Sequence, residues 1–295
     1  MALHKVLAAF AIFSLFVSVA PAQAPLPPST QAQLATLARL EGMTLDDFTK
    51  LVSQAQAGQR EAQYLVALVY EEGRLVTRDD AVAASWMLKS AEQEYGPAQA
   101  GVGQRYIAGV RDNGPIPHRV EAEKWLRLAA AQSDADAQFW LGTAYQRGWF
   151  GAFDDREALQ WLRKAAAQGL PNAQFSLGQI YEDGEGVPES DSLAASWYRK
   201  AADHSPTHLG GAWEAEVQLA YMYRDGRLKD RVQAYMWFAI VGSTVDPPTD
   251  DDMKQVARHM TKAQIVQAQG LAEDWIKRHP WQQQTNVAAS PSPTH

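Results

Sequence analysis

Two histidines four residues apart have the spacing with which a helix presents a pair of zinc ligands. They are His204 and His208. Pro206 lies between them, in a segment running to Gly211 that looks like an insertion, and a proline interrupts a helix. We therefore favour an ordinary polar loop over a metal site, and we predict neither a metal nor a cofactor.

Paired carboxylates are the second set of residues that could do chemistry, as general acid and base. Glu71-Glu72 and Glu182-Asp183 are such pairs, but each falls at the end of an expected helix, where a solvated charge is ordinary. Asp250-Asp251-Asp252 suits the start of a helix, where the dipole favours negative charge. The glycines are preceded by no strand and followed by no phosphate-binding lysine. We predict no catalytic residue and a protein that is not an enzyme.

The composition excludes further classes of function. The chain of 295 residues has no cysteine, which removes disulfides, thiolate nucleophiles and cysteine–metal sites together. The formal charge is −7, from 27 Lys and Arg against 34 Asp and Glu. A negative balance of this kind argues against nucleic acid or an anionic lipid surface as the main partner.

A nine-residue phrase that recurs five times is the dominant feature of the sequence. The copies start at Ala62, Ala98, Ala137, Ala173 and Ala215, spaced 36, 39, 36 and 42 residues apart. Each is followed by a glycine and then by a second phrase, with an alanine three residues before a tryptophan. A period of this length is typical of a solenoid or a repeat array.

Each copy predicts a helix, a turn and a second helix. Ala173, Leu177 and Tyr181 are spaced i, i+4, i+8 and so share one face of a helix. Glycine just past the first helix can take the left-handed conformation that closes it. The residues placed to cap the second helix with a side-chain oxygen are Asp79, Asp154, Ser190 and Asp230, and Glu157 gives Asp154 the capping-box spacing.

The residue after the leucine position is always small, and this predicts close contact between paired helices. It is Ala67, Gly103, Gly142, Gly178 or Ala220. Glycine inside a helix costs about 0.5–1 kcal/mol relative to alanine, so a packing gain must offset it. We expect an aromatic ring to fill the space alongside, and the tryptophans to be core. The structural repeat positions are Trp86, Trp125, Trp161, Trp197, Trp237, Tyr70, Tyr106, Tyr145, Tyr181 and Tyr223.

On these residues the chain resembles the Sel-one-like repeat (SLR) family, a relative of the tetratricopeptide repeat. The copy from Ala173 to Ala202 matches the family pattern best, with Leu177-Gly178, Tyr181 and Trp197 in place. The resemblance implies an all-α fold, a right-handed α-solenoid of helix–turn–helix repeats with helical caps, used as a scaffold for protein interaction. It does not imply an enzyme. The family has cysteine-rich secreted members, from which this chain differs.

The ends of the chain carry other signals. His4 and Lys5, an apolar run from Val6 to Ala20 and a small-residue stretch predict a signal peptide over residues 1–24, cleaved after Ala22 or Ala24. We therefore expect a periplasmic or secreted protein, from a Gram-negative bacterium; the alternative is an uncleaved anchor. We assign residues 25–57 to a linker and N-terminal capping helices, 58–243 to five repeats, 244–278 to C-terminal capping helices and 279–295 to a disordered tail, the helices forming one elongated domain.

The partner is expected to be a protein or peptide bound in a concave groove. Variable positions of the first helices and one turn supply the candidates, which are Tyr64, Gln104, Arg105, Phe139, Thr143, Gln146, Trp149, Phe150 and Gln179. Trp149-Phe150 lies in a turn, where exposed aromatics often mark a contact site, but the pair could equally pack on a neighbouring turn. An alternative function is recognition of cell-wall glycan or peptide, possibly with weak hydrolytic activity. A third is envelope assembly or signalling through oligomerisation.

Overall fold

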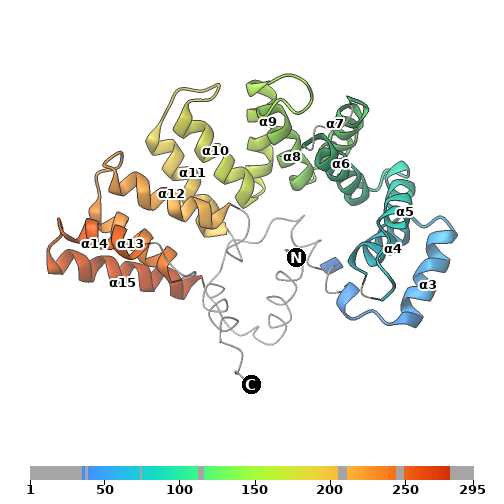
Figure 1. Ribbon diagram of the computed structural model, residues 1–295, viewed down its shortest axis with the longest axis horizontal. Coiled ribbons are helices and arrows are strands. Elements are labelled where there is room, and N and C mark those ends of the chain that lie inside the picture. Colours follow the sequence, from blue (N-terminus) through green and yellow to red (C-terminus); the bar gives the residue numbers. More distant parts are fainter. Residues whose placement is uncertain are drawn as a thin grey trace. The chain divides into compact units, whose positions relative to one another are not determined.

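The computed structural model describes residues 35–36, 39–73, 75–111, 116–204, 211–243 and 249–279, and within them every regular element is an α-helix (Figure 1). The helices from residue 45 onward are α3 (Leu45–Gln56), α4 (Arg60–Glu72), α5 (Asp80–Glu92), α6 (Gly96–Arg111), α7 (Ile116–Ala131), α8 (Ala135–Gln146), α9 (Asp155–Ala167), α10 (Pro171–Asp183), α11 (Asp191–His204), α12 (Ala212–Arg224), α13 (Arg231–Gly242), α14 (Thr249–Ala257) and α15 (Lys262–Arg278). The predicted fold class, an all-α solenoid of helix–turn–helix repeats, is confirmed.

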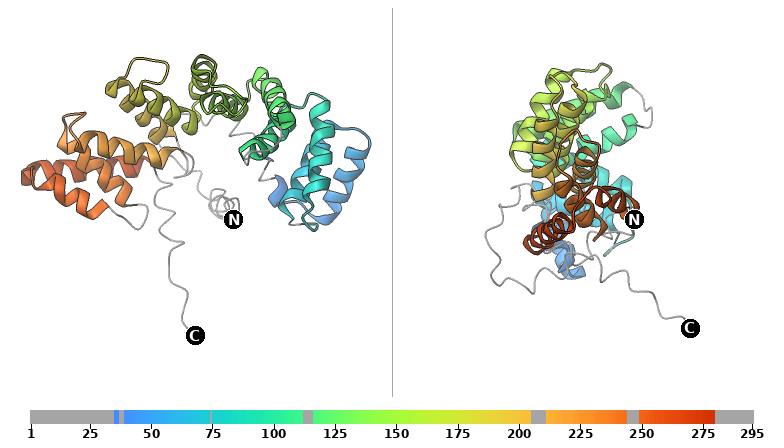
Figure 2. Two further views of the ribbon diagram at one scale, coloured as in Figure 1. Left: turned by 45° about the horizontal axis from the view of Figure 1, so that its top comes forward. Right: turned by 90° about the vertical axis from the view of Figure 1, so that its left-hand side faces the viewer.

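The helices fall into two compact units, with the boundary between them at Ala173 and Gln174 in the sequence of α10. The N-terminal unit extends to Ala173 and holds α3 to α9, while the C-terminal unit starts at Gln174 and continues through α15. Within each unit consecutive helices pack on one another (Figures 1 and 2). Each repeat consists of a first helix (α4, α6, α8, α10 or α12) and the second helix that follows it. In the C-terminal unit, α14 and α15 pack on α13.

The turns between paired helices follow the predicted chemistry. The C-terminal glycines Gly73, Gly148, Gly184 and Gly226 have φ of 69°, 64°, 71° and 79°, the left-handed region. The predicted caps are confirmed, because Asp79, Asp154 and Asp230 accept backbone N–H groups at the starts of α5, α9 and α13, and the Ser190 hydroxyl accepts the Leu193 N–H. Gly109 differs, because α6 continues past it to Arg111.

In the three repeats where the small residue is a glycine, the side chain that fills the space beside it belongs to the position after the tryptophan. A Cβ on Gly103 would lie 2.7 Å from the Leu126 side chain, and a Cβ on Gly178 would overlap the Tyr198 ring. Leu126, Leu162 and Tyr198 are each 0 % exposed. The close approach of the paired helices was therefore predicted correctly, but leucine serves in two repeats where an aromatic ring was expected.

The phased tryptophans divide into two groups, contrary to the prediction that all five are core. Trp125 and Trp237 are buried, whereas Trp86, Trp161 and Trp197 are half-buried. In the half-buried group a lysine three residues on covers the ring, with its ammonium nitrogen 4.4, 3.8 and 3.8 Å from the ring centroid for Lys89, Lys164 and Lys200. Each ring thus lies at the core edge under a cation. Among the phased tyrosines, Tyr145 and Tyr223 are buried, while Tyr70, Tyr106 and Tyr181 are half-buried.

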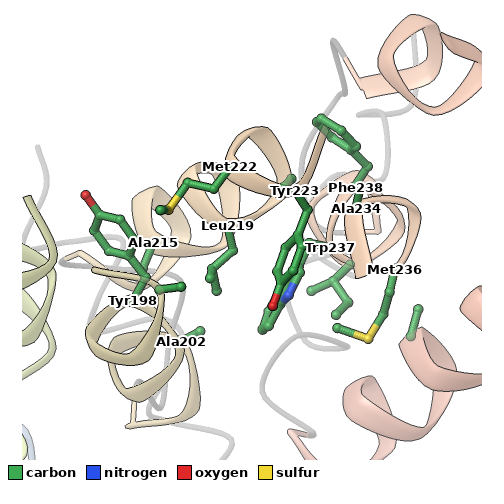
Figure 3. Close-up of a cluster of buried hydrophobic side chains, with 14 of the residues drawn as sticks. Tyr198, Ala202, Ala215, Leu219, Met222, Tyr223, Ala234, Met236, Trp237 and Phe238 are labelled. Atoms are coloured by element: carbon green, nitrogen blue, oxygen red, sulfur yellow. The ribbon is translucent and has the colours of Figure 1, made fainter. Parts of the chain in front are cut away.

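The largest core cluster of the C-terminal unit joins the last repeat to α15. Figure 3 shows Tyr198, Leu219 and Trp237 among the side chains of this cluster. Trp275 of α15 packs against Trp237 with ring centroids 5.6 Å apart. His279 stacks on Trp275 at 3.9 Å and is 8 % exposed. Its assignment to a disordered tail was wrong, because the imidazole covers the end of this core; residues 280–295 lie outside the described residues.

None of the described helices is long and apolar enough to cross a membrane. The predicted signal peptide, residues 1–24, lies outside the described residues.

Candidate interaction surface

The nine residues predicted to contact a partner are all half-buried. Eight of them lie in the N-terminal unit, on α4, α6, α8 and the turn after α8, and Gln179 lies on α10 in the C-terminal unit. Most occupy the positions two, six and nine residues after the first alanine of a repeat, a spacing that shares one helix face. We call this the first-helix face; in α8 it consists of Phe139, Thr143 and Gln146.

Tyr64 contributes to this face from α4, but its ring is largely engaged within the protein. The ring lies 5.4 Å from that of Tyr95, which precedes α6. Burial is the main reason that the pKa of the Tyr64 hydroxyl is raised well above its usual value. Tyr64 therefore acts first as a contact between α4 and the residue that leads into α6, and keeps only part of its surface for a partner.

Arg105 departs most clearly from the repeat pattern. The equivalent residues of the other repeats are apolar and buried, namely Val69, Ala144, Ile180 and Met222. The Arg105 guanidinium ion-pairs with Glu71, with 3.0 Å between Nη2 and Oε2, and its side chain remains 30 % exposed. This ion pair joins α4 to α6. Since a guanidinium carries five N–H donors, it suits recognition of a carboxylate or a carbonyl group.

Phe139 and Thr143 extend the face on α8. The Phe139 ring lies 5.4 Å from that of Trp140, which packs on the core of the unit. The Thr143 hydroxyl oxygen is buried and has no hydrogen-bond partner in the described part of the chain. On α8, the half-buried Phe139 ring therefore offers an apolar contact to a partner, whereas the hydroxyl oxygen of Thr143 is enclosed within the fold.

The turn after α8, residues 148–153, is the aromatic turn. Trp149 and Phe150 are half-buried and pack against the core of the N-terminal unit, and the Phe150 ring meets Tyr145 edge-on at 5.1 Å. The sequence left open whether Trp149 and Phe150 contact a partner or pack within the fold. Much of the surface of both rings is in fact used in packing within the fold. Phe153 is instead 75 % exposed. Its ring lies over Gly148, 3.3 Å from where a Cβ would stand.

Phe153 was missed by the sequence analysis, although a signal for it exists. It occupies the position before the cap of the second helix, where three other repeats carry Arg78, Glu189 and Lys229. Arg78 and Glu189 likewise lie over the glycines that close their first helices. A phenylalanine at a position that is otherwise charged and exposed has no core to fill, and this makes it a candidate contact residue.

A ladder of buried glutamines was also missed. In the N-terminal unit, Nε2 of Gln63, Gln99 and Gln138 donates to the carbonyl oxygen eight residues earlier, at 3.1, 3.2 and 3.2 Å. The Oε1 atom of each accepts from a glutamine at the end of the second helix, and these donors are Gln93, Gln132 and Gln168, at 2.7, 2.8 and 2.9 Å. We call this set the glutamine ladder; it ties consecutive helices together and is structural.

The described residues hold no group of three metal-ligating side chains. His208 and the side chain of His204 lie outside the described residues. That these two histidines belong to an ordinary polar loop, and do not bind a metal, therefore stays a prediction. The acidic turns take part in structural pairings. Glu182 accepts the Tyr198 hydroxyl at 2.5 Å and pairs with Arg227, and Glu71 pairs with Arg105.

Comparison with protein families identifies the repeat. The Sel1 repeat model matches residues 60–95, 96–134, 135–170, 171–206 and 213–240. The chain therefore belongs to the Sel1 repeat family. No curated protein matches the chain.

Solved structures of repeat proteins are similar to the chain. A Sel1 repeat protein from Oxalobacter formigenes is 23% identical over 85% of this chain and 66% of its own, with a TM-score of 0.55. A protective antigen with an SLR fold, present in uropathogenic Escherichia coli strains, is 26% identical over 84% of this chain and 60% of its own, with a TM-score of 0.49. A putative Sel1 repeat protein from Klebsiella pneumoniae subsp. pneumoniae is 23% identical over 71% of this chain and 99% of its own, with a TM-score of 0.47. The chain thus spans less than two thirds of the length of the first two structures.

Proposed function

We propose that the protein is a non-enzymatic, exported scaffold that binds a protein or peptide through the concave face of the solenoid. The Sel1 repeat fold generally mediates protein–protein interaction. In this chain the binding surface comprises the first-helix face of the N-terminal unit, which includes Phe139, together with Arg105 and the aromatic turn. A preformed helical array offers extended surface at little ordering cost on binding.

The observation that carries this proposal is the exposure of Phe153. Three quarters of this side chain faces solvent, at a position where other repeats carry a charge. Arg105 supports it, because a half-buried guanidinium replaces an apolar residue in one repeat only. Aromatic and arginine side chains are the usual anchors of protein interfaces. The partner should therefore present an apolar side chain to the turn and a carboxylate to Arg105.

A photo-crosslinking residue at position 153 of the full chain, expressed in its own host, would identify the partner. The matched control carries the same residue at position 45, because Leu45 is 60 % exposed and also lies in the N-terminal unit. The affinity of the purified partner is then measured for the wild type, Phe153→Lys and Leu45→Lys. Loss of an interface anchor should weaken binding at least about tenfold in Phe153→Lys, and Leu45→Lys should bind as the wild type. Equal affinities for all three proteins would remove the aromatic turn from the binding surface.

Export is tested separately by the mass of the mature N-terminus. We expect it to begin at residue 23 or 25, according to the two cleavage positions. A chain that retains Met1 and stays in the cytoplasmic fraction would contradict export without affecting the proposed binding surface.

A further inference from the structure

The repeat position that supplies the buried glutamines of the first helices holds an acid in the fifth repeat. The residue after the first alanine of a repeat is Gln63, Gln99, Gln138 or Gln174 in the first four repeats, and Glu216 in the fifth. All five side chains are buried, with exposed fractions of 5, 2, 4, 2 and 1 %. A carboxyl group thus occupies a site that the fold elsewhere fills with a neutral amide.

Glu216 lies on a helix that contributes to the apolar core of the C-terminal unit. Helix α12 packs between α11 and α13, and the residues beside Glu216 in sequence and one turn on, Ala215, Leu219 and Ala220, belong to the core cluster that also contains Trp237 and Trp275. Taking an ionised carboxylate out of water into such a site is costly, and the neutral form avoids that cost.

The charged neighbours of Glu216 also disfavour its ionised form. Among the residues that the structure describes, they are Asp203 on α11 and Glu214 on α12 itself, both acidic. His279, after α15, lies 3.8 Å from the Asp203 carboxylate, which also accepts the Trp275 indole N–H at 3.3 Å. Trp275 of α15 and the following His279 therefore hold the Asp203 carboxylate in place, and the negative charge of this carboxylate disfavours ionisation of Glu216 on α12. Helix α13 brings the apolar Trp237 and Phe238 to this core.

We propose that Glu216 makes the C-terminal unit a pH-sensitive element, which is tight while the carboxyl is protonated and loosens when it ionises. The protonated carboxyl keeps one O–H donor, as the glutamine amide keeps its N–H donors. The ionised carboxyl places a negative charge in the core beside Asp203 and Glu214. Relief of that charge requires water to enter between α12 and its neighbours, which opens the packing of the last repeat and α15.

The direction of the pH effect follows from the burial of Glu216. Burial, with the nearby acidic charges, raises the pKa of Glu216 well above its usual value. A raised pKa in the folded state gives stability that is complete below the unfolded pKa of about 4.3 and is lost as the pH rises through the folded pKa. His279 acts in the opposite sense, because burial lowers its pKa and protonation at acid pH weakens the fold.

We propose to measure the thermal unfolding midpoint of the full wild-type chain and of Glu216→Gln between pH 5 and pH 8. The difference between the two midpoints reports the ionisation of Glu216, because every other titrating residue is common to both proteins. We expect similar midpoints at pH 5 and a midpoint at least about 3 °C higher for Glu216→Gln at pH 8. Glu273→Gln is the matched control, since it removes one carboxylate from the exposed face of α15, where the side chain is 71% exposed. This control should keep the wild-type pH response. A wild-type pH response in Glu216→Gln would overturn the proposal.

Two further measurements keep the test decisive if Glu216→Gln fails to fold. Gln138→Glu places the same carboxyl in the glutamine ladder of the N-terminal unit, and it should lose more stability than the wild type on raising the pH. The wild-type chain with ¹³C-labelled glutamate carboxyl carbons should show one resonance that titrates at a higher pH than the others. Titration of every glutamate resonance near pH 4.3 would show that Glu216 is ordinarily ionised and would refute the switch.

Discussion

Gly142 of α8 lies directly against Leu162 of α9, and the two residues set the distance between their helices. A Cβ on residue 142 would stand 2.7 Å from Cγ of Leu162 and 3.1 Å from the carbonyl oxygen of Ala158. Both distances are shorter than ordinary van der Waals contact, and the second involves backbone, which cannot rotate away. The absent side chain of Gly142 therefore allows the close approach of the helix pair.

Gly142→Ala should destabilise the N-terminal unit. Overpacking a close contact costs about 1–3 kcal/mol, and the better helix propensity of alanine returns about 0.5–1 kcal/mol. We expect the free energy of unfolding to fall by about 1–2 kcal/mol in urea titration. Gly270→Ala is the control on α15, because no atom lies within 4 Å of its added Cβ. It should raise the free energy of unfolding by about 0.5–1 kcal/mol; stabilisation by both substitutions would contradict the contact.

Leu162→Ala should lower the free energy of unfolding by about 2–5 kcal/mol, because it opens a cavity at a fully enclosed side chain. Lys164→Ala should lower it by only about 0.5–1 kcal/mol, since it removes a cation from the outer face of Trp161 and leaves the ring in place. Chemical denaturation of both variants gives the comparison. Equal losses in the two variants would mean that the Lys164 contact with the Trp161 ring stabilises the helix pair as much as the enclosed Leu162 side chain does.

Gln138→Leu should lower the free energy of unfolding by about 1–3 kcal/mol, because it leaves polar partners unsatisfied. The Ala130 carbonyl loses its side-chain donor, and the Gln168 amide loses its acceptor. Gln54→Leu on α3 replaces an exposed glutamine and should change stability by no more than about 0.5 kcal/mol. Urea titration of both variants measures the difference, and a neutral Gln138→Leu would show that the ladder adds nothing to stability.

Asp134, the cap of α8, should make the N-terminal unit less stable as the pH rises from about 4 to above 6. Its carboxylate accepts the Ala137 N–H at 2.7 Å, but burial outweighs this hydrogen bond and raises the pKa of Asp134 to about 6. The folded state binds the proton more tightly than the unfolded state, so stability is complete below pH 4 and is lost as the pH passes 6.

Asp134→Asn keeps a good capping side chain and removes the titration. Its thermal midpoint should exceed that of the wild type at pH 8 and should change less between pH 4 and pH 7. A midpoint below that of the wild type at pH 8 would show that the ionised carboxylate is the better cap here.

Local chemistry explains why much of the fold was predictable. Glycine at a left-handed position and aspartate at a helix cap act within a few residues of the chain, so Gly73 and Asp79 could be assigned from the sequence. The exception is Gly109, where α6 continues. A glycine permits a left-handed turn and does not impose one, because a helix ends only where the surrounding packing also favours its end.

The interaction surface was less predictable, because exposure depends on what neighbouring repeats cover. Trp149 and Phe150 look like loop aromatics in the sequence, yet both pack on the core. Phe153 is three residues further along the same turn and is mostly exposed. Three residues of chain separate a half-buried ring that packs on the core from a ring that is mostly exposed. Only the fold of the turn after α8, which places the Phe153 ring over Gly148, decides between them.

By itself, the sequence determined the repeat, its helix pairs, their caps and the need for a small residue at the helix contact, because all of these follow from periodicity and short-range sterics. The tertiary structure decided which side chain occupies that contact, which tryptophans lie at the core edge under a lysine, and which glutamines link one helix to the next. Those outcomes depend on the distances between helices, which result from packing across many residues at once. For the same reason, only the folded C-terminal unit shows that Glu216 is buried, with the acidic Asp203 and Glu214 near it.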